Sequence, residues 1–368
     1  MQITAAVARA AFAPFTIETV DLDNPRDDEL LVEVVASGMC QTDQHGRDGY
    51  FPTMKFPAVF GHEGAGIVRA VGRAVKEFRA GDHVMMAYPW CGHCANCRDH
   101  KPSYCLDVRE LKMGGTRPDG STIHSQNGKP VYGSFFQQSS FGTFTLAHER
   151  FAVKLRQDMP LDIACAFACG AQTGAGAVLN SLAAKTGESF VVFGAGAVGL
   201  SSLMAAKLAG CDPIIAVDVH EHRLKLARDL GATHTINHGG RADVVAEIKK
   251  LTGQGARYAI ETSALPAVLR EAIDVLMPAG TCILLGSARP GTESSFEMPF
   301  LQNGRSVRGV VQGDSVPKEF IPKLIDHFMA GRFPLDRTIT YYALADINRA
   351  AKESNEGKTI KPVLRMPH

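Results

Sequence analysis

The chain has 368 residues, 45% hydrophobic and 21% charged, and is long enough to form two globular domains. Its 39 basic and 38 acidic residues leave a net charge of +1, which gives no electrostatic footprint for nucleic acid or an anionic membrane. No apolar run reaches the ~20 residues of a membrane-spanning helix. Nine cysteines without an export signal favour metal binding over disulfides, and we expect a cytoplasmic protein.

The N-terminal part of the chain predicts a domain rich in strands and turns. Residues 30–35 and 66–71 are β-rich and are bounded by Gly and Pro. Residues 106–140 show little periodicity, which predicts a long loop or short hairpins, and loops of that length are often functional. From residue 135 the pattern returns to that of a strand.

From about residue 160, apolar β-rich runs alternate with helical segments, which predicts a doubly wound parallel sheet. The predicted strands are 190–193, 214–217, 258–261, 281–285 and 307–311, and the predicted helices are 197–209, 221–230, 267–276 and 318–330. Polar segments then lead to a closing strand at 361–364. We therefore expect an α/β chain with a β-rich domain formed by 1–164 and 306–368, and a nucleotide-binding domain formed by 165–305.

The sequence Gly194-Ala-Gly196-Ala-Val-Gly199 lies between a predicted strand and a predicted helix, and Asp218 ends the next strand. In that context the glycine pattern predicts a dinucleotide site. Gly194 permits a tight turn, Gly196 lets the backbone approach a pyrophosphate, and Gly199 lets helix and strand pack closely. Asp218 would accept hydrogen bonds from the adenosine ribose, which favours NAD over NADP, and we expect Arg223 to line the adenosine.

Four cysteines, Cys91, Cys94, Cys97 and Cys105, fall within one short segment. Tight Cys-x-x-Cys turns let several sulfur atoms face one tetrahedral ion. Four thiolates leave no open coordination position, so the pattern predicts a structural zinc site.

His62 is a second candidate ligand, because it stands among glycines in Gly61-His62-Glu63-Gly64. Glycine supplies no side chain for a core, so such a segment suits a place where backbone crowds a ligand. A lone histidine on a turn is, however, more often a satisfied core residue. The cysteines outside the four-cysteine segment are Cys40, Cys165, Cys169, Cys211 and Cys282, and spacing alone does not say which of them joins His62.

Six motifs in this order and spacing together resemble the zinc-dependent medium-chain alcohol dehydrogenases over essentially the whole chain. They are Gly-Met-Cys-x-Thr-Asp (38–43), Gly-His-Glu-Gly-x-Gly (61–66), Gly-Asp-His-Val (81–84), the four-cysteine segment, Cys-Gly-x-Gln-Thr-Gly (169–174) and the glycine pattern at 194–199. Within that family the chain is most similar to bacterial benzyl or aryl-alcohol dehydrogenases, through residues 139–144, 169–177 and 310–318. The resemblance implies a GroES-like catalytic domain and a Rossmann coenzyme domain.

The resemblance also implies a ligand set for a catalytic zinc. Cys40, His62 and Cys169 would bind the metal and leave the fourth position open. Asp43 would orient His62 from behind, and Glu63 would be a carboxylate near the metal. Together with the four-cysteine site, this gives two zinc ions per chain.

Further roles follow from the same resemblance. Thr42 would take the hydroxyl proton of the alcohol, and His45 would release it to solvent, although His45 could instead be only a surface histidine. Gln41 stands where many relatives carry Arg or His against the pyrophosphate, which predicts weaker retention of NADH. Thr173 belongs to a motif that accompanies the nucleotide site. Cys165 would be a packing residue.

The expected function is reversible oxidation of a primary aromatic or allylic alcohol to its aldehyde with NAD. Phe51, Tyr88 and Trp90 would form an aromatic wall of the substrate pocket, although plain core packing explains each nearly as well. Alternatives in the same class are a glutathione-dependent formaldehyde dehydrogenase and a general aliphatic alcohol dehydrogenase. A polyol dehydrogenase is disfavoured because Cys169 stands where those enzymes carry a carboxylate.

Outside that class, we considered a metal-free quinone reductase, a crystallin-like structural protein and a zinc-binding interaction module. The first two typically lack Cys40, His62 and the four-cysteine segment together. We expect a small-molecule substrate, no nucleic-acid or membrane partner, and a homotetramer rather than a dimer. Strand 281–285 or strand 307–311 would pair two nucleotide domains along a sheet edge.

Overall fold

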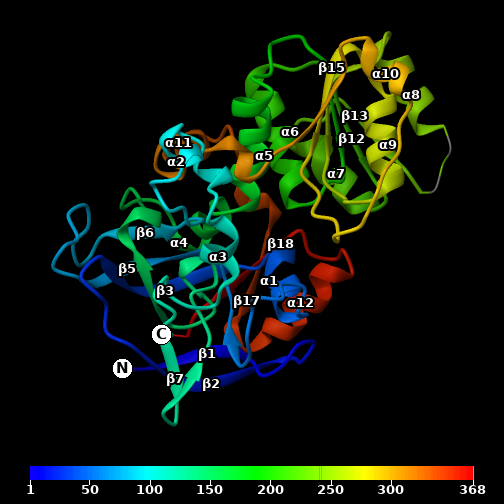
Figure 1. The fold of residues 1–368 in the computed structure, drawn as a ribbon. Helices are drawn as coiled ribbons and strands as arrows, with labels where there is room; N and C mark the ends of the chain where they lie inside the picture. The colour runs from blue at the N-terminus through cyan, green and yellow to red at the C-terminus, as the bar shows by residue number, and fades with distance from the viewer. Residues whose placement is uncertain (240, 242, 368) are drawn as a thin grey trace. The chain divides into compact units, whose positions relative to one another are not determined.

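The computed structural model describes residues 1–239, 241 and 243–367 (Figure 1). The chain divides into two compact units. The first comprises Met1–Cys169, Val316–Met329 and the chain from Leu335 onward, and the second comprises Gly170–Ser315 and Ala330–Pro334. The boundaries expected after residues 164 and 305 thus precede those of the structure, which follow Cys169 and Ser315.

The first unit contains two mainly antiparallel sheets. The order in one sheet is β4 (Ala58–Val59), β1 (Gln2–Ala8), β2 (Phe15–Leu22), β7 (His124–Gln126) and β8 (Lys129–Val131). The order in the other is β10 (Ala152–Lys154), β6 (His83–Met86), β5 (Gly64–Val71), β3 (Glu29–Gly38), β18 (Lys361–Arg365) and β17 (Ile339–Ala343), and β9 (Phe144–His148) also pairs with β3. Buried residues of both sheets form one hydrophobic core.

Strand β3 brings the two ends of the chain together. Its long apolar run pairs with β5 along most of its length, and β18, from the C-terminal end, pairs antiparallel with its last residues. Val363 lies opposite Gly38, which places the start of β18 beside the segment that follows β3. This pairing brings Lys361 close to residues 38–40.

The helices of the first unit are short at the N-terminal side and longer at the C-terminal side. They are α1 (Gln41–Arg47), α2 (Ala95–Arg98), α3 (Val108–Met113), α4 (Leu161–Ala164), α11 (Pro317–Met329) and α12 (Ile347–Asn355). The β7–β8 hairpin agrees with the short hairpins expected within residues 106–140, but α3 lies in the same stretch and was not expected. Strand β17 and helix α12 occupy what we read only as polar segments.

The strand expected from residue 135 is wrong for its first part. Residues Phe135–Gln137 form a 3₁₀ turn, and Phe136 and Gln137 have φ angles of +53° and +56°. A left-handed backbone cannot continue a pleated strand. Strand β9 therefore begins only at Phe144.

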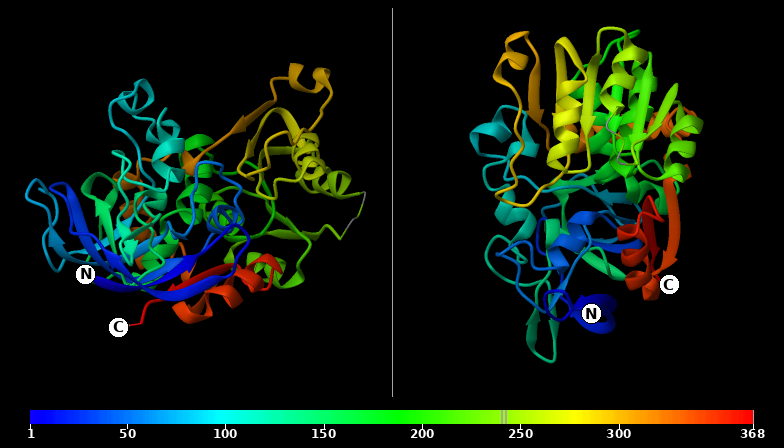
Figure 2. Two further views of the ribbon diagram at one scale, coloured as in Figure 1. Left: turned by 60° about the horizontal axis from the view of Figure 1, so that its bottom comes forward. Right: turned by 90° about the vertical axis from the view of Figure 1, so that its right-hand side faces the viewer.

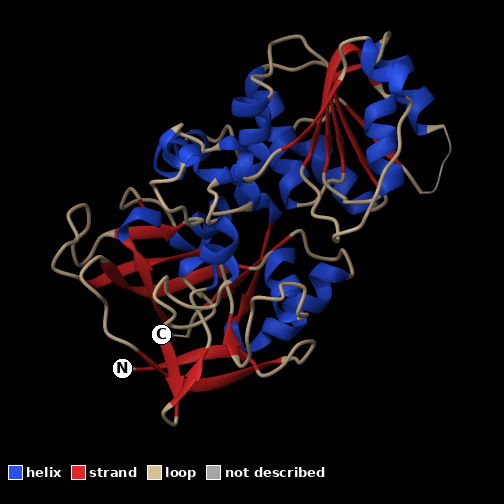
Figure 3. Cartoon of the chain, in the orientation of Figure 1, coloured by secondary structure: helices blue, strands red, loops and turns tan. Residues whose placement is uncertain are grey.

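The second unit is a doubly wound sheet of six parallel strands. The order is β13 (His234–Asn237), β12 (Ile214–Asp218), β11 (Phe190–Phe193), β14 (Ala256–Glu261), β15 (Leu276–Leu284) and β16 (Ser306–Gly309). Helices flank both faces of this sheet (Figure 3). They include α5 (Gly170–Gly176), α6 (Ala197–Ala209), α7 (Glu221–Leu230), α8 (Val244–Thr252), α9 (Pro266–Asp274) and α10 (Met298–Gln302). This strand order is that of a Rossmann fold, so the expected α/β class is confirmed.

The sheet positions of β15 and β16 distinguish the two strands that we considered for pairing between subunits. Strand β15 pairs with β14 on one side and β16 on the other, so residues 281–284 have no free edge. Strand β16 ends the strand order, in the yellow-to-orange part of the sheet (Figure 2). The expectation for strand 281–285 is therefore wrong, and of these two strands only β16 lies at an edge of the sheet.

In the described part of the chain, no single helix is both long and apolar enough to cross a membrane. Only two short helical stretches taken together, Leu161–Phe167 and Gly170–Ser181, reach that length and composition.

Candidate metal centres and nucleotide loop

The first unit brings Cys40, His62, Glu63 and Cys169 together, with one ligand atom from each within 4.8 Å of the others. Cys40 is the residue that precedes helix α1, and His62 lies in the turn before strand β5. Cys169 is the last residue of the first part of this unit. Three segments that are distant in sequence thus meet at one point, which spacing alone did not predict.

Asp43 fixes the orientation of the His62 ring. Its Oδ1 lies 2.8 Å from His62 Nδ1, and both side chains are buried. The same carboxylate accepts hydrogen bonds from the backbone N–H groups of Cys40, at 2.9 Å, and Gly61, at 3.2 Å. Because Nδ1 is engaged by Asp43, the other ring nitrogen is available to a ligand. Although burial opposes it, the Asp43 charge raises the pKa of His62 to about 10.

The remaining donor atoms of this cluster fit a zinc ion. His62 Nε2 is buried and has no hydrogen-bond partner in the described structure. A hydrogen bond between the thiols of Cys40 and Cys169 lowers the pKa of Cys40 far below its ordinary value and raises that of Cys169. Two sulfur atoms and one imidazole are a typical donor set for zinc with a fourth position left for another ligand. The unpartnered His62 Nε2 lies beside the two thiols, so all three donor atoms could bind one zinc ion.

Lys361 is a residue of the site that sequence reasoning missed. It enters from strand β18, is only 3% exposed, and forms an ion pair with Glu63. Its Nζ also lies 3.4 Å from the Met39 carbonyl oxygen. A Cβ on Gly38 would lie 2.1 Å from the Glu63 carboxylate, so only glycine fits at that position. Burial raises the pKa of Glu63 to about 7 in spite of the Lys361 charge.

The four-cysteine segment folds into a second cluster. One sulfur atom from each of Cys91, Cys94, Cys97 and Cys105 lies within 4.8 Å of the others. Backbone N–H groups point at these sulfur atoms: Cys94 N lies 3.3 Å from Cys91 Sγ, and Cys91 N lies 3.2 Å from Cys105 Sγ. The four sulfur atoms can complete a tetrahedral shell on their own.

The glycine loop of the second unit has the predicted geometry. Gly194 has a φ of +96°, and Gly196 precedes helix α6. A Cβ on Gly199 would lie 1.8 Å from the Gly194 carbonyl oxygen, so helix and strand require glycine there. Apart from Gly196 itself and its chain neighbours, no atom of the described chain lies within 4 Å of a Cβ built on Gly196. That open space at the N-terminus of a helix fits a phosphate group.

Asp218 ends strand β12 and braces the same loop. Its carboxylate accepts hydrogen bonds from Ala195 N at 2.6 Å and His220 N at 2.8 Å. An ionised carboxylate accepts about four hydrogen bonds, so it retains capacity for hydroxyl groups. Arg223 Nη1 lies 3.9 Å from the Asp218 carboxylate. Thr173 lies on helix α5, and this helix packs against α6 at Val198.

Comparison with known proteins supports this geometry. Residues 26–157 match the model of the alcohol dehydrogenase GroES-like domain, and residues 197–329 match that of the zinc-binding dehydrogenases. The sequence is 41% identical to a geraniol dehydrogenase of Castellaniella defragrans over 98% of this chain and 96% of that protein. The chain belongs to the zinc-dependent medium-chain alcohol dehydrogenases.

Two further members of the family are also similar over their whole length. An S-(hydroxymethyl)glutathione dehydrogenase of Paracoccus denitrificans is 35% identical over 99% of this chain and 100% of that protein. The crystal structure of a benzyl alcohol dehydrogenase from Acinetobacter calcoaceticus aligns with a TM-score of 0.96 and 41% identity over 100% of both chains. This zinc alcohol dehydrogenase therefore has the cofactors of its family, zinc and NAD(P).

Helix α1 of the dehydrogenase carries the other polar residues singled out in the sequence. Thr42 Oγ1 lies 3.7 Å from Cys40 Sγ. His45, one turn further, is stacked on Tyr50, with ring centroids 4.7 Å apart. Gln41, the first residue of the helix, is exposed. The short helix thus starts at the metal cluster with Cys40 and leads away from it through Thr42 and His45.

Two aromatic side chains that the sequence did not single out lie against His62. Phe136 stacks on the imidazole with centroids 4.5 Å apart, and Phe135 meets it edge-on at 5.9 Å. Phe51 contacts Phe135, with ring centroids 6.4 Å apart, and Tyr50, at 5.4 Å. The left-handed turn at residues 134–137 places both phenylalanines against the cluster, and no periodic pattern in the sequence signals such a turn.

Tyr88 and Trp90 lie 5.8 Å apart but have different surroundings. Trp90 contacts Phe151 and lines a cavity of about 730 Å³ that also includes Leu111 and Arg117. Tyr88 is buried, faces Lys112 and does not line that cavity. Tyr88 and Trp90 thus adjoin each other, and the aromatic wall of Phe51, Tyr88 and Trp90 stays a prediction.

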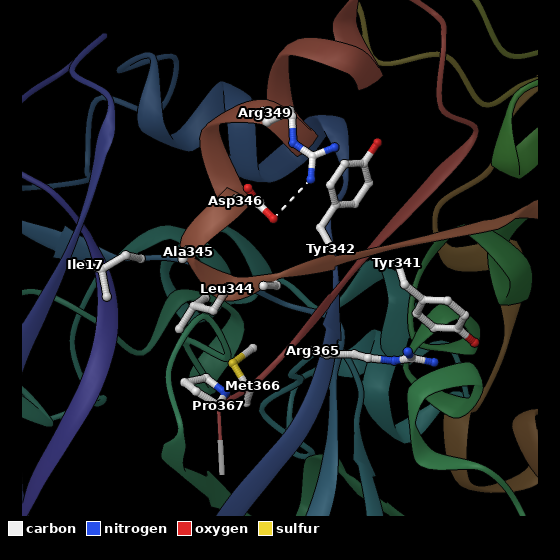
Figure 4. Close-up of a pocket in the computed structure, with 11 residues that line it drawn as sticks. Ile17, Tyr341, Tyr342, Leu344, Ala345, Asp346, Arg349, Arg365, Met366 and Pro367 are labelled. Carbon is white, nitrogen blue, oxygen red and sulfur yellow. Dashed lines mark hydrogen bonds and ion pairs between the residues drawn. The ribbon is translucent and has the colours of Figure 1, made fainter.

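Another hollow, of about 440 Å³, lies at strands β17 and β18 (Figure 4). Its charged side chains are already paired: Arg349 with Asp346 at 3.0 Å, and Arg365 with Asp162 at 2.6 Å. None of its lining residues is a candidate metal ligand. This hollow adds no reactive group to the dehydrogenase.

Proposed function

We propose that this dehydrogenase catalyses the reversible oxidation of a primary aromatic or allylic alcohol to its aldehyde, with NAD as hydride acceptor. The observation that carries the proposal is the Cys40–His62–Cys169 cluster with the ring of Phe136 stacked on its imidazole. Flat aromatic faces beside a metal centre suit a planar aryl or allylic group. Two similar proteins, named for geraniol and for benzyl alcohol, support the same substrate class.

Cys40, His62 and Cys169 would hold the catalytic zinc. When bound, this zinc supplies a Lewis acid that lowers the pKa of an alcohol. Two thiolates cancel its charge, so the buried site does not have to hold a net positive charge. Asp43 accepts the Nδ1–H of His62 and so keeps Nε2 free as a ligand atom. Glu63, held by Lys361, contributes a carboxylate at the rim of the cluster.

Thr42 and His45 would carry the hydroxyl proton away. Thr42 stands at the first turn of α1, close enough to Cys40 for its hydroxyl to face an alcohol at the cluster. A hydroxyl group accepts one proton while it releases another, so it can act as a relay. A histidine side chain suits proton exchange with solvent near neutral pH, and His45 lies about one turn beyond Thr42 on the same helix. General acid–base assistance of this kind contributes roughly 10²- to 10⁴-fold to a rate.

The second unit would bind the dinucleotide, which supplies the hydride acceptor when it is bound. Gly194, Gly196 and Gly199 shape the phosphate turn at the N-terminus of α6. The Asp218 carboxylate favours ribose hydroxyl groups and repels a 2′-phosphate, which supports NAD over NADP. Arg223, beside Asp218, would line the adenosine, and Thr173 would support the loop from α5.

The four-cysteine cluster would hold a second zinc with a purely structural role. Its donor set is complete without water or substrate. We therefore propose two zinc ions per chain. We also propose that the subunits pair along the free edge of β16 and that the assembly is a homotetramer.

A kinetic panel tests the substrate class. Benzyl, cinnamyl, monoterpene and short aliphatic alcohols should be compared with NAD and with NADP. We expect kcat/KM with NAD to be highest for the aromatic and allylic alcohols. A preference for short aliphatic alcohols would contradict the proposal.

The glutathione-dependent relative makes formaldehyde oxidation the second candidate. That reaction starts from the adduct of formaldehyde with glutathione. Turnover of formaldehyde that requires glutathione and exceeds the turnover of benzyl alcohol would favour this candidate.

A further inference from the structure

Lys112 is a buried lysine whose ammonium group faces aromatic rings rather than a carboxylate. It lies on helix α3 and is only 7% exposed. Within the described chain it makes no hydrogen bond and no ion pair. Its Nζ lies over two aromatic rings, 5.2 Å from the centroid of Tyr88 and 5.4 Å from that of Phe136. A buried charge without a counter-charge costs free energy that a fold normally avoids.

The other buried lysine of the described chain shows the usual solution. Lys361 is 3% exposed and forms an ion pair with the Glu63 carboxylate. The two rings around Lys112 attract its charge through cation–π interactions, but they do not neutralise it or accept its N–H groups in strong hydrogen bonds. Burial lowers the pKa of Lys112 to about 8, with the thiolates of Cys169 and Cys105 acting in the opposite direction. The ammonium group therefore keeps its charge at pH 7.

The position of Lys112 relates it to the metal cluster. Phe136 stacks on His62 with centroids 4.5 Å apart, and Lys112 Nζ lies 5.4 Å from the same Phe136 ring. Added together, these two distances put the ammonium group no more than about 10 Å from the imidazole. Both distances are measured to the Phe136 ring, so His62 and Lys112 adjoin the same aromatic side chain.

We propose that Lys112 binds a carboxylate at the end of the alcohol substrate remote from its hydroxyl group. This inference rests on the proposed function, because it assigns the substrate class of the same site. A carboxylate supplies both the missing counter-charge and acceptors for the three N–H groups of the ammonium. The substrate class is then an aromatic or allylic alcohol that carries a carboxylate, for example a 4-(hydroxymethyl)benzoate.

A structural role is the competing explanation. Cys105, a member of the four-cysteine cluster, is one of the groups that act on Lys112 electrostatically. If Lys112 only balanced the negative charge of that cluster, its removal would weaken metal binding there and lower the melting temperature. If it binds substrate, an apolar replacement of similar length should leave the melting temperature unchanged or raise it.

The first test is the ratio of kcat/KM for 4-(hydroxymethyl)benzoate to that for the neutral 4-(hydroxymethyl)benzamide. In the wild type we expect the carboxylate to be preferred by roughly 10- to 100-fold, the range of a charge-assisted hydrogen bond. Lys112→Met should remove this preference, and Lys112→Arg should keep part of it. Lys55→Met is the matched control, because Lys55 also lies over an aromatic ring, that of Tyr132 at 5.6 Å, but is exposed.

A second test does not depend on turnover. The affinity of the zinc-loaded protein for benzoate should be measured by titration calorimetry, and Lys112→Met should weaken it by roughly 10- to 100-fold. Unchanged benzoate affinity, or a wild type that turns over both alcohols equally well, overturns the proposal while the alcohol dehydrogenase function stands. If no aromatic or allylic alcohol is oxidised, the proposed function fails, and the benzoate titration still decides the role of Lys112. Loss of zinc from the four-cysteine cluster in Lys112→Met would support the structural role instead.

Discussion

The four-cysteine cluster and the Cys40 cluster belong to the same unit and share thiolate donors, but the chain assembles them by different means. The four cysteines follow one another within one surface segment, and short turns bring their sulfur atoms together. Cys40, His62 and Cys169 meet only after β3, β5 and the segment before α5 have packed. The first cluster is closed by four like donors, and the second has three donors and a carboxylate at its rim. Local assembly suits a structural site, and long-range assembly suits an open one.

The largest expected effect is a loss of catalytic activity when the Cys40 cluster, but not the four-cysteine cluster, loses a ligand. His62→Ala removes the buried imidazole donor, so turnover should fall by roughly 10³-fold or more, because a bound metal supplies several kcal/mol to the transition state. NADH binding and the metal of the four-cysteine cluster should remain. Steady-state kinetics measure the turnover, and fluorescence titration measures the affinity for NADH. His93→Ala, at an exposed histidine near the other cluster, is the control and should keep its activity. Full activity in His62→Ala would mean that this cluster is not the catalytic centre.

A smaller effect on the same cluster is expected when Asp43, which contacts His62 Nδ1, loses its charge. Asp43→Asn keeps the size of the side chain but loses the negative charge that faces Nδ1. Metal affinity or activity should fall by roughly 10- to 100-fold, as for other groups that orient a ligand. Competition with a chromophoric chelator gives the affinity. An unchanged affinity would show that the buried packing of His62 alone fixes its ring.

Removing a ligand of the four-cysteine cluster should lower the thermal stability of the protein more than its catalytic rate. Cys97→Ser removes one of four like donors, so the variant should lose the metal of this cluster and unfold at a lower temperature. Its kcat per mole of remaining zinc should stay within a few-fold of that of the wild type. Calorimetric melting and zinc analysis after gel filtration provide these values. A loss of kcat as large as that of His62→Ala would contradict a purely structural role.

The unit that holds both clusters should lose stability in acid because of the buried His124. Burial, helped by the Arg117 charge, lowers the pKa of His124 from 6.5 to about 3. The unfolded chain therefore binds this proton more readily between those values, and the stability that neutral His124 provides is complete above pH 6.5 and is lost as the pH falls. The slope is roughly 1.4 kcal/mol per pH unit. His124→Gln should flatten the profile of unfolding free energy between pH 6 and pH 4, measured by urea titration. The exposed His93→Gln should not, and a slope in His124→Gln equal to that of the wild type would contradict this account.

The smallest effect concerns the coenzyme rather than either cluster. Gln41 is exposed at the first turn of α1, and an arginine there would add a charge-assisted hydrogen bond to a phosphate. Gln41→Arg should slow the dissociation of NADH by about tenfold, the effect of roughly 1.4 kcal/mol. Stopped-flow displacement measures the rate. If the rate does not change, Gln41 does not weaken NADH retention.

The sequence predicted best what depends on local patterns. Helix α6 runs from Ala197 to Ala209 as expected, because a glycine turn and an apolar run define it. The four-cysteine cluster could be read from spacing alone. The open cluster could not, because its ligands come from distant segments, and only the resemblance to a family connected them.

Other parts of the site were not predicted for physical reasons. Phe135 and Phe136 read as a strand because aromatic residues favour strands, but the backbone there is left-handed. Lys361 and Lys112 are ordinary lysines in the sequence, and only long-range packing buries them. Helix α12 did leave a signal, since Ile347, Ala350 and Ala351 are buried at helical spacing.

Zinc analysis of the wild type beside the two single-cluster variants is the most direct test of the account. The wild type should contain two zinc ions per chain, and His62→Ala and Cys97→Ser should each contain about one, with only His62→Ala inactive. One zinc in the wild type, or loss of both ions in His62→Ala while the protein remains folded by circular dichroism, would contradict two independent sites.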